Sequence, residues 1–188
     1  MVNLTDKRKI FAWAAAACFA VCFLASLVPS VHFIRENGGL IVMTAIMNLI
    51  TYPGLAFTVF RRDKKGVMTV ACVQFAANLL VLLINLGPSF GDLIPVFRMG
   101  AYALLAFAAI RSGLENGRIG WLWFLPGVFG LAAMAAWAGQ SWFPEFFQSF
   151  MEMNLYDWVY AVAETAALFL AGLWLKHDPT PVRISVSG

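Results

Sequence analysis

Long apolar stretches alternate with short polar loops along nearly the whole chain, and six such stretches can be distinguished. Each has roughly the 17–25 residues that an α-helix needs to cross a hydrocarbon core about 30 Å thick. The pattern predicts an all-α, polytopic membrane protein in which residues 1–188 form a single integral membrane domain. The predicted spans are residues 10–33, 40–60, 67–86, 93–110, 120–139 and 155–175, followed by a cytoplasmic tail over residues 176–188.

Basic residues cluster at the N-terminus, in every second loop and at the C-terminus, so most of them lie on one side of the predicted helices. With the N-terminus in the cytoplasm, the inner side holds all but two of the 13 Lys and Arg residues. The exceptions are Arg35 in an outer loop and Arg98 within the fourth span. Short cytoplasmic loops carry such an excess of positive charge. Both termini are therefore predicted to be cytoplasmic, in a bacterial inner (plasma) membrane, and the basic loops indicate no binding of nucleic acid.

The composition agrees with a membrane protein and leaves little room for a soluble domain. Apolar residues make up 61% of the chain and charged residues 12%, whereas soluble proteins have about 25% charged residues. Cys18, Cys22 and Cys72 form no Cys-x-x-Cys pair, which argues against a redox or zinc site. His32 and His177 are predicted on opposite sides of the membrane. We therefore expect neither a metal nor a cofactor.

The loop before the last span has a helical pattern of its own. Between residues 140 and 154, large apolar side chains recur three and four positions apart, with acidic and polar residues between them. This pattern predicts a short amphipathic helix in the outer interface, which would anchor the protein there or cover a site beneath it. The apolar positions are Trp142, Phe143, Phe146, Phe147, Phe150 and Met151.

Polar and charged side chains inside the predicted spans are the main indication of function. When depth is counted at about 1.5 Å per residue, Arg98, Asn48, Asn78 and Glu164 lie about 8–13 Å below the outer boundary. A charge at that depth is costly unless it is paired or hydrated. We therefore expect Arg98 to pair with Glu164 or with Asp157.

These intramembrane polar groups have two interpretations. Either they satisfy one another as interhelical hydrogen bonds and one buried ion pair, or they line a cavity that is open to the outside. One Arg, two carboxylates and two Tyr exceed what packing requires, so we favour an outward-facing pocket that binds or translocates a small polar or anionic solute. Arg98 would hold an anionic group or neutralise Glu164. The predicted ligand-binding residues are Asn48, Tyr52, Gln74, Asn78, Asn85, Arg98, Asp157, Tyr160 and Glu164.

Small residues recur on the first predicted helix, where Ala12, Ala16 and Ala20 are spaced four apart. This spacing lets a second helix approach closely, so the face is a candidate contact for a membrane partner subunit. Together with the chain length, six helices and a cytoplasmic N-terminus, it resembles the substrate-binding components of energy-coupling factor transporters. That resemblance implies capture of a vitamin or similar solute from outside and docking on a separate energising module.

Two other classes of function stay open at this point. The main one is a non-catalytic accessory or assembly subunit of a membrane complex, whose polar stripes would meet a partner helix. The minor one is an intramembrane enzyme that uses Glu164 or Asp157 as a general base on a lipid. Residues 87–91 (GPSFG) match the letters of a serine nucleophile elbow, but they lack the preceding strand that the motif requires. We expect the protein not to be an enzyme.

Overall fold

The computed structural model describes residues 4–36, 40–84, 93–112, 120–139 and 155–178. These residues form helices and turns, and no strand occurs among them. The all-α prediction is confirmed for this part of the chain. In chain order the elements are α1 (Leu4–Glu36), α2 (Leu40–Phe60), α3 (Lys64–Ile84), α4 (Leu93–Arg111), the 3₁₀-helix η2 (Leu122–Phe124), α5 (Leu125–Gly139) and α7 (Leu155–His177).

Among the described residues, four helices contain stretches that are long and apolar enough to cross a membrane. These stretches are Lys7–Leu27, Lys64–Leu83, Leu93–Arg111 and Tyr156–His177. Two further apolar helical segments, Ala45–Phe60 and Leu122–Ala136, are shorter. The lengths and compositions of these helices are those of a multi-pass membrane protein.

The fifth predicted span, residues 120–139, is not one continuous helix. Its first part is a turn followed by η2, and α5 begins only at Leu125. Pro126 then lies in the first turn of α5, where its missing N–H is no loss because the first N–H groups of a helix have no intrahelical acceptor. The predicted amphipathic helix of residues 140–154 and the tail from residue 179 lie outside the described residues, while α7 extends into the predicted tail as far as His177.

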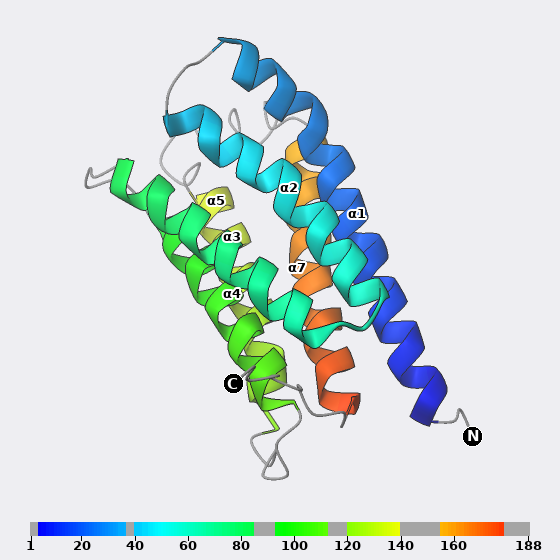
Figure 1. The fold of residues 1–188 in the computed structure, drawn as a ribbon. Helices are drawn as coiled ribbons and strands as arrows, with labels where there is room; N and C mark the ends of the chain where they lie inside the picture. Colours follow the sequence, from blue (N-terminus) through cyan, green and yellow to red (C-terminus); the bar gives the residue numbers. More distant parts are fainter. Residues whose placement is uncertain (1–3, 37–39, 85–92, 113–119, 140–154, 179–188) are drawn as a thin grey trace, which may run out of the picture.

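The six α-helices of the described residues lie alongside one another (Figure 1), and their contacts form a closed ring that follows the order of the sequence. Each helix packs against its neighbours in the chain, and α7 packs against α1 to close the ring. At this closure the rings of Phe11 and His177 stack with 5.7 Å between their centroids, and Arg8 Nη1 lies 4.0 Å from Asp178 Oδ1. The start of α1 and the end of α7 therefore share one end of the bundle.

A contact between α4 and α7 crosses the middle of the ring. It matters for the site because α4 carries Arg98 and α7 carries Glu164. In a ring of six helices these two would otherwise be separated by α5. The contact brings the two charged side chains into reach of each other.

Glycines allow α7 to approach its other neighbours closely. A Cβ atom at Gly172 of α7 would lie 1.9 Å from the carbonyl oxygen of Trp123 in η2. Only glycine permits this approach, because the atom in the way belongs to the backbone and cannot move aside easily. A Cβ at Gly127 of α5 would likewise lie 2.2 Å from the ring of Phe169. Together these contacts hold α7 against α5 and η2.

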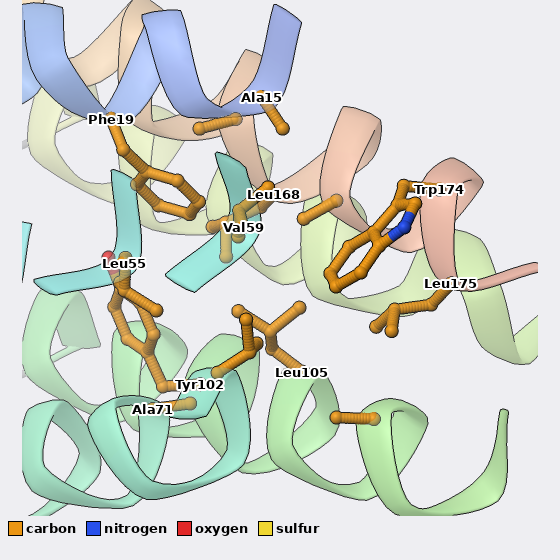
Figure 2. Close-up of a cluster of buried hydrophobic side chains, with 14 of the residues drawn as sticks. Ala15, Phe19, Leu55, Val59, Ala71, Tyr102, Leu105, Leu168, Trp174 and Leu175 are labelled. Atoms are coloured by element: carbon orange, nitrogen blue, oxygen red, sulfur yellow. The ribbon is translucent and has the colours of Figure 1, made fainter. Parts of the chain in front are cut away.

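Large apolar side chains fill the interior of the ring toward the end that holds the start of α1. Figure 2 shows side chains of α2, α4 and α7 converging there, with Phe19 of α1 beside them. Since α2, α4 and α7 all run toward this end (Figure 1), the later residues of each helix form the packed layer. We call this layer the apolar plug; its members, each at most 1% exposed, are Leu55, Val59, Leu105, Leu168, Trp174 and Leu175.

A buried polar contact lies at the same end of the bundle as the apolar plug. Lys64 Nζ donates a hydrogen bond to the carbonyl oxygen of Asp178 at 2.7 Å and to that of Ser112 at 3.5 Å. It also lies 3.7 Å from Asp178 Oδ1. Lys64 thus ties the start of α3 to the segments that follow α4 and α7.

The three alanines of the predicted partner face do not share one exposed surface. Ala12 is fully buried and Ala16 is 7% exposed, whereas Ala20 is exposed. The closed ring explains this, because α1 packs against both α2 and α7. Ala12 and Ala16 therefore serve contacts within the chain, and Ala20 is left on the surface.

Candidate functional site

The carboxylate of Glu164 is the centre of a polar cluster inside the ring. Its Oε2 accepts hydrogen bonds from Arg98 Nη2 at 2.7 Å and from Arg98 Nε at 3.0 Å. The side chains are 17% exposed for Arg98 and 6% exposed for Glu164. Of the two carboxylates predicted as partners of Arg98, Glu164 is therefore the one that forms the ion pair.

Tyrosine hydroxyls satisfy the other oxygen of Glu164. Tyr102 donates to Oε1 at 2.6 Å, Tyr52 at 2.7 Å and Tyr160 at 3.4 Å. The hydroxyls of Tyr52 and Tyr160 also share a hydrogen bond, and their rings meet edge to face. Side chains of α2, α4 and α7 thus converge on one carboxylate, which joins three helices.

Tyr102 is a member of the cluster that the sequence analysis missed. It is fully buried and lies four residues after Arg98 on α4. Residues four apart share one face of a helix, so this spacing is the signal that could have placed Tyr102 beside Arg98. A tyrosine in an apolar span that has no charged residue four positions away gives no comparable indication of a polar site.

One side of the Arg98 guanidinium is not used by this cluster. Its hydrogen bonds run from Nε and Nη2 to Glu164, with a longer one from Nη2 to the Tyr52 hydroxyl at 3.4 Å. Within the described residues, Nη1 makes no hydrogen bond. The guanidinium carbon lies 4.8 Å from the centre of the Tyr160 ring, a cation–π distance. Arg98 is thus held rigidly while one nitrogen stays available.

A cavity of about 130 Å³ opens beside Arg98, between α4, α5 and α7. Asp157 lines it and is itself exposed, and it forms no ion pair or hydrogen bond with another described residue. The cavity is therefore lined by charges of both signs. Its lining residues are Ile94, Arg98, Gly130, Ala133, Met134, Asp157, Tyr160, Ala161 and Glu164.

A second cavity of about 80 Å³ lies on the other side of Arg98, between α2, α3 and α4. Asn48 and Asn78 supply its neutral polar groups. Arg98 and Ile94 line both cavities and so form the wall between them. The structure thus brings Asn48, Asn78 and Arg98 together, as the sequence predicted for residues at one depth.

Gln74 has a different environment from the other predicted site residues. It is 1% exposed, and its Nε2 donates to Asn48 Oδ1 at 2.7 Å. Thr51 donates to its Oε1, and Asn78 Nδ2 donates to its backbone oxygen at 2.8 Å. Gln74 lines neither of the two cavities, so its contacts join α3 to α2. Asn85, the remaining predicted site residue, lies outside the described residues.

No group of three or more His, Cys, Asp or Glu side chains that could hold a metal ion occurs among the described residues. No protein family, curated protein or solved structure matches the chain significantly.

Proposed function

We propose that the protein crosses the membrane six times with both termini in the cytoplasm, and that it binds or translocates a small polar solute from the outer side. The observation that carries this proposal is the position of Arg98. It forms the wall between two cavities and keeps one guanidinium nitrogen unengaged among the described residues. Such a nitrogen is the donor that an anionic or polar group would use.

The cost of burying charge supports a binding role over a purely structural one. Buried ion pairs can often be replaced by apolar side chains without loss of stability, so packing alone gives little reason to keep one inside an apolar bundle. Ionisable residues within membrane spans usually pair with one another and mark pathways for substrates or ions. Here the pair adjoins cavities, which is the arrangement that a binding site needs.

The apolar plug supports access from the outer side. Tyr52 precedes Leu55 and Val59 on α2, and Arg98 precedes Leu105 on α4. Since both helices run toward the plug, the charged cluster lies on the side of the plug away from the basic termini. A solute would enter from the opposite side, as a substrate-binding component of a transporter requires.

The cavities limit the size of the solute. Their volumes of about 130 and 80 Å³ exceed the roughly 10–15 Å³ that one water needs. They are well below the roughly 300–1,000 Å³ of pockets for drug-sized ligands. The solute of this proposal is therefore a compact molecule with few non-hydrogen atoms.

Native mass spectrometry of gently extracted full-length protein tests the proposal, with wild type beside an Arg98→Ala variant. We expect a small molecule bound to the wild type and absent from the variant. Gln74→Leu is the matched control, because it removes a buried polar side chain that lines neither cavity. The control should retain the small molecule. Bare wild-type protein whose stability equals that of Arg98→Ala would refute a role for Arg98.

A second candidate function, a non-catalytic subunit of a membrane complex, is favoured by an apolar groove between α1 and α2. The groove has a volume of about 630 Å³. Trp13, Phe57 and Phe60 in its lining are 54%, 57% and 57% exposed, and Ala20 is an exposed small residue among them. A partner helix could pack closely there. A protein that co-purifies with wild type and Arg98→Ala alike, but not with Ala20→Trp, would support this role.

A lipid-modifying enzyme that uses Glu164 as its base receives less support. Both oxygens of Glu164 accept hydrogen bonds from within the chain. A general base needs a lone pair directed at the substrate. This argues against Glu164 as the base but does not apply to Asp157, the other base considered; we propose binding or transport.

A further inference from the structure

Opposite charges line the larger of the two cavities beside Arg98, the one between α4, α5 and α7, at two separate places. Arg98 lines it from α4, and Asp157 lines it from the first turn of α7. Within the described residues, Arg98 Nη1 and the Asp157 carboxylate make no hydrogen bond. A ligand in this cavity therefore meets one hydrogen-bond donor with positive charge and one acceptor with negative charge.

The balance of charge argues against a simple anion as the ligand. Among the described residues that line the cavity, Arg98 is neutralised by Glu164, and Asp157 adds one further negative charge. An anion would bring a second unmatched negative charge into the same cavity, where like charges repel. A zwitterion adds no net charge, and its positive group can lie next to Asp157 while its negative group lies next to Arg98.

The order of residues along α7 keeps the two charged places of the cavity apart. Asp157 and Glu164 lie seven residues apart on α7, which is about 10 Å along the helix axis. Arg98 is held at the Glu164 end of this distance, with Nη2 2.7 Å from Oε2. A ligand that reaches both Asp157 and Arg98 therefore carries its two charges at separate ends.

The rest of the cavity would accommodate a short carbon chain. Ile94, Ala133, Met134 and Ala161 contribute apolar side chains to the lining. The volume of about 130 Å³ suits a chain of a few carbons between two charged ends and excludes a larger body.

From these observations we infer that the ligand of the larger cavity is a small zwitterion, with a carboxylate bound to Arg98 and an ammonium group bound to Asp157. This inference rests on the proposed function, because it assigns the chemical class of the solute for the same site. Arg98 selects the acidic end, Asp157 the basic end, and the cavity limits the length between them.

Titration calorimetry on the purified full-length protein tests the inference with three probes of one length: 4-aminobutanoate, butanoate and butylammonium. The wild type should bind 4-aminobutanoate most tightly. Asp157→Asn should raise the Kd of 4-aminobutanoate at least about tenfold, the loss of one charge-assisted hydrogen bond. The Kd of butanoate for Asp157→Asn should be equal to or lower than its Kd for the wild type. Asp157→Glu retains the charge and should retain the preference for the zwitterion.

The outcomes separate the inference from the proposed function. If butanoate binds the wild type as well as 4-aminobutanoate and Asp157→Asn changes neither, the zwitterion is wrong and a binding site at Arg98 stands. If butylammonium binds best and Arg98→Ala does not weaken it, the ligand is a cation and the inference is again wrong. If none of the probes binds and no solute co-purifies with the wild type, both proposals fall.

Discussion

Replacing Glu164 by Gln tests how far the buried ion pair stabilises the fold. The change removes the counter-charge of Arg98 while keeping the size of the side chain. The two hydrogen bonds from Arg98 to Glu164 Oε2, at 2.7 and 3.0 Å, lose their charge-assisted acceptor. The remaining amide oxygen can still accept from Tyr52 and Tyr102. Since removal of one partner of a buried pair costs about 3–5 kcal/mol, we expect a loss near the lower limit, about 3 kcal/mol.

Arg98→Met and the double variant complete the cycle. Arg98→Met leaves the Glu164 carboxylate buried with only its tyrosine donors, so we again expect a loss near the lower limit, about 3 kcal/mol. The double variant contains no unmatched charge. Its expected loss is about 1 kcal/mol, the value of a typical hydrogen bond. The double variant should therefore be more stable than either single variant.

The measurement is reversible unfolding of purified protein in mixed micelles with a rising fraction of SDS, followed by the fluorescence of its seven Trp residues. Each variant is compared with the wild type at one protein concentration. If both single variants lie within about 0.5 kcal/mol of the wild type, the pair does not stabilise the fold. If the losses of the single variants simply add in the double, the two charges do not interact, and the reasoning is refuted.

Three further predictions follow from the packing and the orientation. Gly172→Ala places a Cβ against the backbone oxygen of Trp123 and should lower the stability by about 1–3 kcal/mol in the same unfolding assay. In the control Gly120→Ala the new Cβ meets nothing within 4 Å, so the stability should hardly change. Equal losses of stability in the two variants would contradict the packing argument. Gln74→Leu breaks the hydrogen bonds between α2 and α3 and should cost about 1 kcal/mol; an unchanged unfolding midpoint would show that these bonds contribute nothing. In a cysteine-free background, Lys65→Cys should react with a membrane-impermeant maleimide only after the cells are opened. Labelling of this cysteine in intact cells would show that the orientation is the opposite of the proposed one.

The sequence predicted part of the site because depth in the membrane can be counted along each helix. Arg98 was expected to pair with Glu164 or Asp157, and the structure selects Glu164. Tyr102 was missed, although it makes one of the shorter hydrogen bonds to that carboxylate. Gln74 shares its helix with Asn78, yet it bonds across to α2 and lines neither cavity. The spacing of residues identifies a common face, but not the helix that this face meets.

The sequence by itself determined the all-α class and the approximate limits of the helices. These follow from local properties, namely the length of each apolar stretch and the polar residues that interrupt it. The tertiary structure alone decided that the helices close into a ring, that α4 touches α7 across it, and that Ala12 is buried inside. Such contacts depend on how each helix is rotated about its axis and how far it lies from its neighbours. Both are set by packing between residues that are distant in the sequence. Gly172 is an example, because its lack of a side chain lets the backbone of Trp123 come close.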